Sequence, residues 1–421
     1  MHPTLSSLFQ LPRLAPRARM RAEGAFASLA CARATNLLLP SLCFVVALAS
    51  FNAAQQPAPP QADMTIDAAT RTQVIEETLR NLREAYVSPE VATRMEQSIR
   101  ERVSKKEYEG ITSAKTLART LTEHLQAVSR DKHLRVNYRA AALAEGDIPG
   151  GVRRRVVPRA PDGGSGGSRP AGGAPVVRRG GGGAGEAAGN LGLEKVETLG
   201  GNVGLLDFSM FDSSPAANAK ISEAMNRLSD TDALIIDLRR CRGGARNAIT
   251  LLMSYLFDKS VHLSDAYDRI SDSTDESWSH ASVPGRRYAQ KDVYILTSSF
   301  TFSAAEDVSY TLKNLKRATI VGETTGGGAH PVTGRRLNDH FFVMVPYARY
   351  VSPITKTNWE GVGVEPDIKT PAAHALKVAH LAVLKKIDAT GRDATKAAPQ
   401  LKALIETLQK ELDEARRETL K

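Results

Sequence analysis

A cluster of hydroxyl side chains lies between an apolar run and a helical pattern in the second half of this chain. The segment TSSFTFSAAEDVSYTL (297–312) follows the β-branched run DVYIL (292–296), and from Val308 on apolar residues recur at helical spacing. The hydroxyls therefore fall at a strand-to-helix turn, where the first N–H groups of the helix have no partner inside it. Ser303, followed by two alanines, is a candidate nucleophile.

A serine hydroxyl attacks a carbonyl when a base removes its proton and N–H groups hold the oxyanion that forms. The N–H of Ala304 is one candidate donor, and the N–H of Gly243 or Gly244 is the second, because glycine lets the backbone approach a ligand closely. Glu306 is placed to counter the positive start of the helix or to hold a neighbouring glycine loop. The alternative is that Ser303 only caps the helix, since serine is a preferred N-cap residue. Spacing alone leaves both roles open.

Strand and helix patterns alternate after Asn190, which predicts an α/β domain. Ligands of such domains gather beyond the carboxyl ends of the strands. Those ends carry Gly243 and Gly244, Ser303, and the glycine loop with His330, so we expect these residues at one edge of the sheet. The runs that predict strands are 201–211, 232–244, 292–296 and 317–331.

The rest of the chain separates into segments of different composition. Helical stripes between 66 and 128 predict a small helical bundle, and residues 141–190, rich in Gly, Pro and Arg, predict a flexible insertion. Two amphipathic C-terminal helices are expected to pack on the core or to join subunits into a homo-oligomer. The predicted domains are a leader with signal peptide (1–54), a helical subdomain (62–140), the insertion (141–190), a core (191–372) and C-terminal helices (373–421).

Charge and the N-terminus indicate the compartment. The net charge of +10 is concentrated in residues 1–50, with five Arg against one Glu, and in the insertion, with seven Arg against four acids, so we expect no nucleic-acid partner. An apolar stretch of 13 residues, Leu37 to Ala49, is shorter than the ~20 residues of a membrane span. It predicts a secretory signal peptide cleaved between 49 and 54, with export to the periplasm or outside the cell; an uncleaved anchor is the alternative. Only Cys241 would remain, which excludes an internal disulfide.

Four ordered motifs carry a family resemblance. The motifs ALIIDLRRCRGG, TSSFTFSAAE, IVGETTGGGAHP and NWEGVGVEPDI resemble those of the tail-specific, or C-terminal processing, serine peptidases. The likeness is greatest to the branch with the tricorn core protease and the interphotoreceptor retinoid-binding protein repeats. This resemblance implies a crotonase-like spiral of ββα units, a helical N-terminal subdomain and Ser303 as the nucleophile.

The chain also departs from that family pattern. Bacterial members use a lysine in the glycine loop as base, but here Gly328 occupies that position, so the resemblance implies a histidine. His133 in SRDKHLRV matches the catalytic histidine of the tricorn-like branch, and His330 is the competitor; His330, Gly327 and Gly328 are expected to line the substrate cleft. Glu360 in NWEGVGVEPDI matches the acid that orients the histidine.

We therefore predict an exported serine-type peptidase that hydrolyses peptides or unfolded proteins by a Ser-His-Glu acyl-enzyme mechanism. The chain has no segment suited to a PDZ domain, and no metal-ligand spacing such as H-E-x-x-H, so neither a metal nor a cofactor is expected. No membrane span is expected after removal of the signal. The same resemblance supplies an alternative, a non-catalytic exported protein that binds hydrophobic ligands, as the retinoid-binding repeats do.

Overall fold

The computed structural model describes residues 61–144, 146–148, 190–389 and 398–419. The predicted leader and signal peptide, and nearly all of the predicted insertion, lie outside these residues. Within the described part, no helix combines the length and the apolar character needed to cross a membrane. Cys241 is buried and free.

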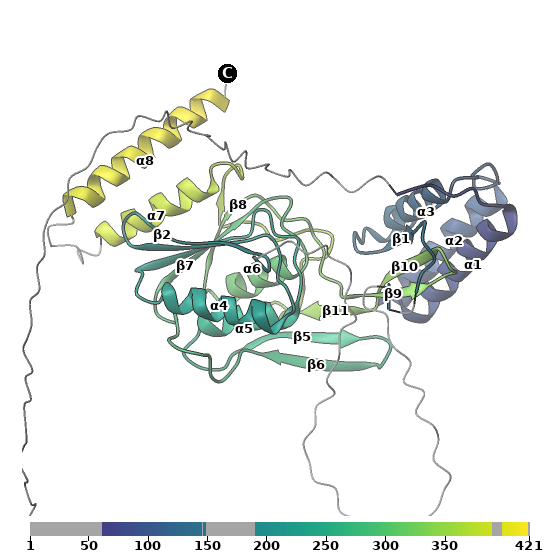
Figure 1. Ribbon diagram of the computed structural model, residues 1–421, viewed down its shortest axis with the longest axis horizontal. Coiled ribbons are helices and arrows are strands. Elements are labelled where there is room, and N and C mark those ends of the chain that lie inside the picture. The colour runs from purple at the N-terminus through teal and green to yellow at the C-terminus, as the bar shows by residue number, and fades with distance from the viewer. Residues whose placement is uncertain (1–60, 145, 149–189, 390–397, 420–421) are drawn as a thin grey trace, which may run out of the picture. The chain divides into compact units, whose positions relative to one another are not determined.

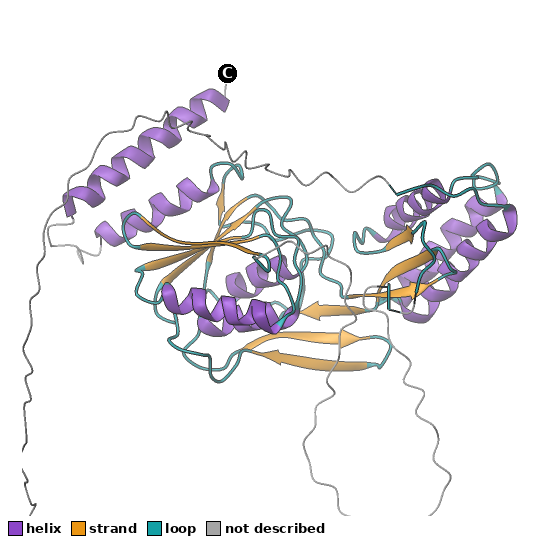
Figure 2. Ribbon diagram, in the orientation of Figure 1, coloured by secondary structure: helices purple, strands orange, loops and turns teal. Residues whose placement is uncertain are grey.

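A six-stranded mixed sheet forms the centre of the α/β part (Figure 2). Its strand order is β12-β8-β7-β4-β3-β2, and all neighbours are parallel except β2 and β3. The strands are β2 (Leu193–Leu199), β3 (Val203–Phe208), β4 (Ala233–Asp237), β7 (Asp292–Thr297), β8 (Thr319–Gly322) and β12 (Ile368–Lys369). The parallel order brings the carboxyl ends of β4, β7 and β8 to one edge, as the sequence predicted.

Helices cover both faces of this sheet (Figure 1). In β4, Leu234 and Ile236 face one cluster of apolar side chains, whereas Ala233 and Ile235 face another. Because both faces are buried, the strand reads as a continuous apolar run without polar alternation. The first face is covered by α4 (Pro215–Arg227), α5 (Arg246–Tyr255) and α6 (Ala304–Asn314), and the second by α7 (Ala375–Ala389) and α8 (Ala398–Thr419).

Three capped helices form the N-terminal region. They are α1 (Ala68–Ala85), α2 (Pro89–Ser104) and α3 (Ala114–Ser129). Each is preceded by an extended residue whose side chain accepts a hydrogen bond from an N–H of the first turn: Asp67, Ser88 and Ser113. Such caps satisfy N–H groups that have no partner inside the helix.

A hairpin from far along the chain completes this helical region. The strands β9 (Val332–Arg336) and β10 (Phe341–Pro346) pair with β1 (Arg135–Tyr138) in the order β1-β10-β9. Phe341 and Val343 are buried among the apolar side chains of the three helices. Residues that follow the glycine loop therefore belong to the packing core of the N-terminal helices, which the sequence pattern did not indicate. A third sheet consists of β5 (His262–Asp268), β6 (Ser273–Trp278) and β11 (Ala348–Val351).

Candidate active site

Ser303 precedes α6 in a conformation that ordinary helix caps do not adopt. Its backbone has φ 57° and ψ −123°, whereas the capping residues of α1 to α4 are all extended. A positive φ is unfavourable for a residue with a Cβ and persists where the surroundings enforce it, often at functional sites. The Ser303 N–H donates to the Glu306 carboxylate (2.8 Å), and the Ser303 carbonyl accepts from the Glu306 N–H (2.8 Å). The carboxylate and the backbone N–H of Glu306 thus fix this turn at both ends.

Gly243 lies directly against Ser303. A Cβ at Gly243 would lie 2.8 Å from the Ala304 nitrogen and 2.8 Å from the Ser303 Cβ, and its φ of 97° also favours glycine. The hydrogen bond from the Phe302 N–H to the Cys241 carbonyl (3.1 Å) joins the two turns. The glycine is therefore required by this close approach of two backbones.

The N–H groups needed for an oxyanion site are available around Ser303. Gly244 is held against Phe211, since a Cβ there would lie 2.2 Å from the Phe211 carbonyl oxygen. Among the described residues, the N–H groups of Gly243, Gly244 and Ala304 donate to no acceptor. Free N–H groups beside a candidate nucleophile are the donors that oxyanion stabilisation uses.

Glu306 holds the glycine loop against the Ser303 turn. Its buried carboxylate accepts four hydrogen bonds: from the N–H groups of Ser303 (2.8 Å), Gly327 (2.6 Å) and Gly328 (2.9 Å) and from the Thr325 hydroxyl (2.5 Å). Burial raises the pKa of Glu306 above its ordinary value, while these four donors work in the opposite direction. Of the two roles that the sequence allowed, the structure shows the loop contact.

We expect Glu306→Ala to lower the free energy of unfolding by about 3 kcal/mol, because four donors would lose their buried acceptor. Urea denaturation measures this change. The matched control is Glu365→Ala, which removes an exposed carboxylate paired with Lys369 and should change stability by no more than about 0.5 kcal/mol. Equal midpoints for the two variants would contradict the structural role of Glu306.

His133 lies beside the same turn. Its ring packs on Phe302, the residue before Ser303, with 4.6 Å between ring centroids. Its backbone N–H donates to Asp131 Oδ1 (3.0 Å). Its Nδ1 atom is buried and has no hydrogen-bond partner in the described part of the chain. Burial lowers the pKa of His133 to about 4, partly opposed by the charge of Asp131, so the imidazole is neutral at pH 7. A neutral imidazole can accept a proton.

Gly328 occupies the position in the glycine loop at which the bacterial peptidases named above carry a lysine. A Cβ at this position would lie 2.2 Å from Phe302 Cζ and 2.7 Å from His133 Cε1. The space next to Gly328 is thus filled by the two rings, so a lysine there would collide with them. The His133 ring occupies part of the space that a side chain at position 328 would fill.

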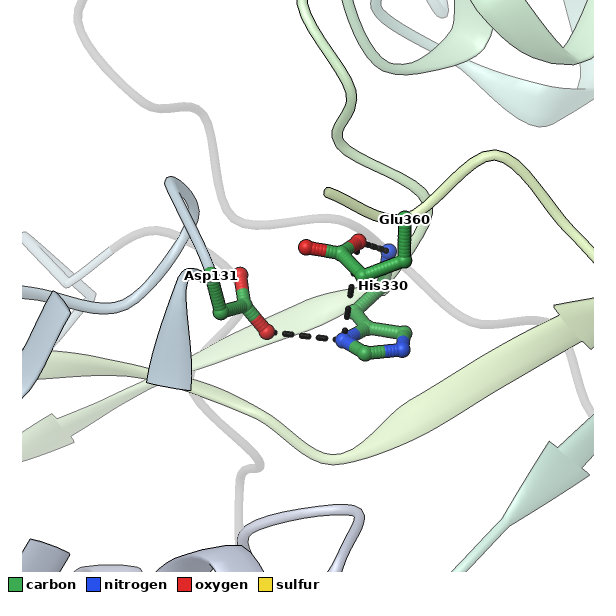
Figure 3. Close-up of side chains that lie close together, drawn as sticks. All are labelled: Asp131, His330 and Glu360. Atoms are coloured by element: carbon green, nitrogen blue, oxygen red, sulfur yellow. Dashed lines mark hydrogen bonds and ion pairs between the residues drawn. The ribbon is translucent and has the colours of Figure 1, made fainter. Parts of the chain in front are cut away.

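His330 lies between two carboxylates (Figure 3). Its Nδ1 is 2.7 Å from Asp131 Oδ2 and 3.6 Å from Glu360 Oε2, and Asp131 also accepts from the Tyr86 hydroxyl (3.2 Å). Burial acts against a charged imidazole, but the hydrogen bond to Asp131 and the negative charge of Glu360 together raise the pKa of His330.

Glu360 is oriented by the main chain of the glycine loop. Its Oε2 accepts from the N–H groups of Ala329 (2.6 Å) and His330 (3.2 Å), whereas its Oε1 is buried without a partner. Burial, aided by the charge of Asp131, raises the pKa of Glu360 to about 7. In the described residues Glu360 contacts His330 and makes no hydrogen bond to His133.

Sequence reasoning missed Asp131. The Asp131 side chain is fully buried. It accepts a hydrogen bond from the backbone N–H of His133 and also bonds to the ring nitrogen Nδ1 of His330. Its position two residues before His133 in the same motif was the signal that could have singled it out. A carboxylate buried between two histidines is a constituent of the site.

Two groups of side chains have the donor atoms and spacing for a divalent cation. In each, the ligand atoms lie within 4.8 Å of one another. In the group at the site, the Asp131 and His330 ligand atoms already bond to each other. The groups are Asp131, His330 and Glu360, and His262, Asp265 and Glu276.

Comparison with known proteins assigns the fold around this site. The profile of peptidase family S41 matches residues 202–370, and that of the N-terminal domain of peptidase S41 in eukaryotic interphotoreceptor retinoid-binding protein matches residues 66–161. Residues 202–370 belong to peptidase family S41. The S41 domain contains all the candidate residues described above except His133 and Asp131, which lie in the N-terminal domain.

Two curated relatives match part of this chain at moderate identity. Carboxyl-terminal-processing peptidase 2 of Arabidopsis thaliana chloroplasts is 28% identical over 172 residues, which are 40% of this chain and 32% of that protein. The carboxyl-terminal-processing protease of Synechocystis is 27% identical over 157 residues, or 37% and 35% of the two chains. The chain thus spans about a third of the length of each relative.

Solved structures of low sequence identity also match. A peptidase-like protein from Parabacteroides merdae has a TM-score of 0.48 and 16% identity, over 72% of this chain and 90% of that chain. The tricorn protease has a TM-score of 0.44 and 14% identity, over 80% of this chain and 37% of that chain.

Proposed function

We propose that this chain is a serine-type peptidase that forms an acyl-enzyme on Ser303. The observation that carries the proposal is the enforced positive-φ turn at Ser303, packed on Gly243 and surrounded by N–H groups without acceptors. A turn of this kind exposes a hydroxyl beyond the end of a strand and directs backbone N–H donors toward the same point. Membership of a peptidase family supports the same reaction class.

His133 is the proposed base and Glu360 the group that orients it. His133 Nδ1 and Glu360 Oε1 are both buried, and neither has a hydrogen-bond partner among the described residues. Buried polar atoms are rarely left unpaired, so a hydrogen bond between these two atoms in the substrate complex would satisfy both. Such a bond would leave His133 Nε2 for the Ser303 proton and would stabilise the imidazolium that follows.

The reaction then proceeds in two halves. The Ser303 oxygen bonds to the peptide carbonyl carbon as His133 takes the hydroxyl proton, and the N–H groups of Ala304 and of Gly243 or Gly244 hold the oxyanion. His133 returns the proton to the leaving amine when the C–N bond breaks. Water, deprotonated by His133, next attacks the acyl carbon; the bond from that carbon to the Ser303 oxygen breaks, and His133 returns the proton to this oxygen.

We expect the rate to rise as the pH increases through about 7. Glu360 must be ionised to stabilise the imidazolium that forms on His133. Burial raises the pKa of Glu360 to about 7, whereas His133 is already neutral there. Glu360→Gln should lower kcat/KM at pH 8 by about 10² to 10⁴ and remove the rise near pH 7. The pH profile of kcat/KM checks both effects. A Glu360→Gln profile parallel to that of the unmodified enzyme would contradict this role for Glu360.

The wider setting is proposed from the sequence. The proposal includes a crotonase-like spiral of ββα units, export directed by a signal peptide at the apolar stretch Leu37 to Ala49, and a peptide or unfolded protein as substrate. Neither a PDZ domain nor a lysine base takes part in the proposed mechanism.

Hydrolysis of an unbiased peptide mixture, read by mass spectrometry, tests the function. The chain from about Gln55 should generate new peptide ends, and Ser303→Ala should generate none. Identical product patterns for the two proteins would overturn the proposal. If neither cleaved any peptide, binding of hydrophobic ligands would become the better account.

A further inference from the structure

Three arginines lie in the turn that follows β4, and two of them are neutralised. Arg239 pairs with Asp237 (2.6 Å), and Arg240 pairs with Asp207 (2.7 Å). Arg242 makes no ion pair with any acidic group in the described residues. It is exposed in the sequence RRCRGG, immediately before Gly243. One cation beside the oxyanion turn is therefore left without an anion.

An exposed aromatic ring holds this cation in place. The Arg242 guanidinium carbon lies 3.8 Å from the centre of the Phe300 ring, and Phe300 is 48% exposed. Stacking on an aromatic face fixes the plane of a guanidinium and leaves the N–H groups at its edge free to bind a ligand. A large apolar side chain exposed at this point has no evident role in packing.

Both partners of the stack flank Ser303. Arg242 precedes Gly243, which touches the Ser303 Cβ, and Phe300 lies three residues before Ser303 in the same turn. The bond between the Phe302 N–H and the Cys241 carbonyl (3.1 Å) holds the two segments together. An extended peptide advances about 3.5 Å per residue, so groups within two or three residues of the cut are in reach of the guanidinium.

We propose that Arg242, stacked on Phe300, forms a carboxylate-binding subsite that selects substrates with a carboxylate within about three residues of the scissile bond. This inference rests on the proposed peptidase activity and names the class of its substrates. A guanidinium binds a carboxylate through two parallel N–H···O bonds, whether it belongs to an Asp or Glu side chain or to the C-terminus of the peptide. The carboxylate would neutralise the one unpaired cation of this turn.

The test uses one cleaved peptide in matched forms. In one set of peptide pairs, Glu is compared with Gln at each position within three residues of the cut. In a further pair, a free C-terminus is compared with an amidated one at the same distance from the cut. The unmodified enzyme should favour the carboxylate form of at least one pair by about tenfold in kcat/KM, the order of a charge-assisted hydrogen bond exposed to water. The pair that responds identifies the source of the carboxylate. High salt should reduce the preference.

Two variants decide whether Arg242 is responsible. Arg242→Ala should lose the preference and still cleave the uncharged peptides, whereas Arg240→Ala, in the same turn but paired with Asp207, should keep it. Cleavage with equal rates for all matched pairs, or a preference that survives in Arg242→Ala, would overturn the subsite and leave the peptidase intact. Failure of the unmodified enzyme to cleave any peptide would overturn the proposed function and the subsite with it.

Discussion

We expect Ser303→Ala to lower kcat/KM for peptide hydrolysis by about 10⁴ or more and to leave the fold unchanged. Loss of the nucleophile removes the acyl-enzyme route, and the remaining oxyanion donors supply only residual catalysis. Alanine and serine differ by one hydroxyl, and both carry the Cβ that meets Gly243. We therefore expect the free energy of unfolding to change by less than about 0.5 kcal/mol. Steady-state kinetics and urea denaturation measure the two quantities.

Ser299→Ala is the matched control for this experiment. It makes the same substitution at an exposed position in the same turn, four residues before Ser303. Its activity should equal that of the unmodified chain. Hydrolysis by Ser303→Ala at the rate of the control would exclude Ser303 as nucleophile, and a comparable loss in both variants would place the effect in the turn as a whole.

His133→Ala lowers kcat/KM by about 10³ to 10⁴, because the serine loses the base that takes its proton. His330→Asn is the comparison variant, since an asparagine amide can still donate to the buried Asp131, which is now bound by His330 Nδ1. We expect His330→Asn to retain activity within about tenfold. Kinetics of the two variants on one peptide measure the difference. A reversed order of the losses would assign the base to His330.

The pH profile separates the two histidines independently. With Glu360→Gln as background, the limb due to Glu360 is absent and only the base remains to titrate. The pKa of His133 is lowered to about 4 by burial, so a His133 base gives a rate that is constant above pH 5 and falls only near 4. The hydrogen bond to Asp131 remains in this background and opposes the lowering of the His330 pKa by burial, so a His330 base would cause activity to fall at a higher pH than a His133 base. The midpoint of the acid limb thus identifies the residue.

Local pattern was enough to find most of the elements around Ser303. The apolar run of β4 predicted a strand, and the run is continuous because both faces of the sheet are covered. Gly243 was expected to let the backbone approach a ligand and Gly328 to line the substrate cleft; in the structure Gly243 lies against the Ser303 turn and Gly328 against Phe302 and His133. The two roles considered for Ser303, cap or nucleophile, involve the same local sequence. Only its φ of 57° distinguishes it from the extended caps elsewhere in the chain.

Contacts between distant segments were beyond the sequence. Asp131 and His330 are 199 residues apart, and their hydrogen bond exists because the loop after α3 meets the loop after β8. The contact between these loops also places Glu360 beside His330. Among the described residues, Glu360 Oε1 and His133 Nδ1 then have no hydrogen-bond partner. The pKa shifts of these groups follow from burial and from neighbouring charges, which a linear pattern does not encode.

The sequence by itself indicated the family through its ordered motifs. It also predicted the α/β domain and the nucleophile candidate with its glycine-rich neighbours, because periodicity and turn chemistry are local properties. The tertiary structure decided which residues surround that candidate. It placed β9 and β10 with the N-terminal helices, tied Glu306 to the glycine loop and left Arg242 alone among three arginines without an acidic partner. These outcomes depend on which loops meet in space, and hydrogen bonds and ion pairs form only where they meet.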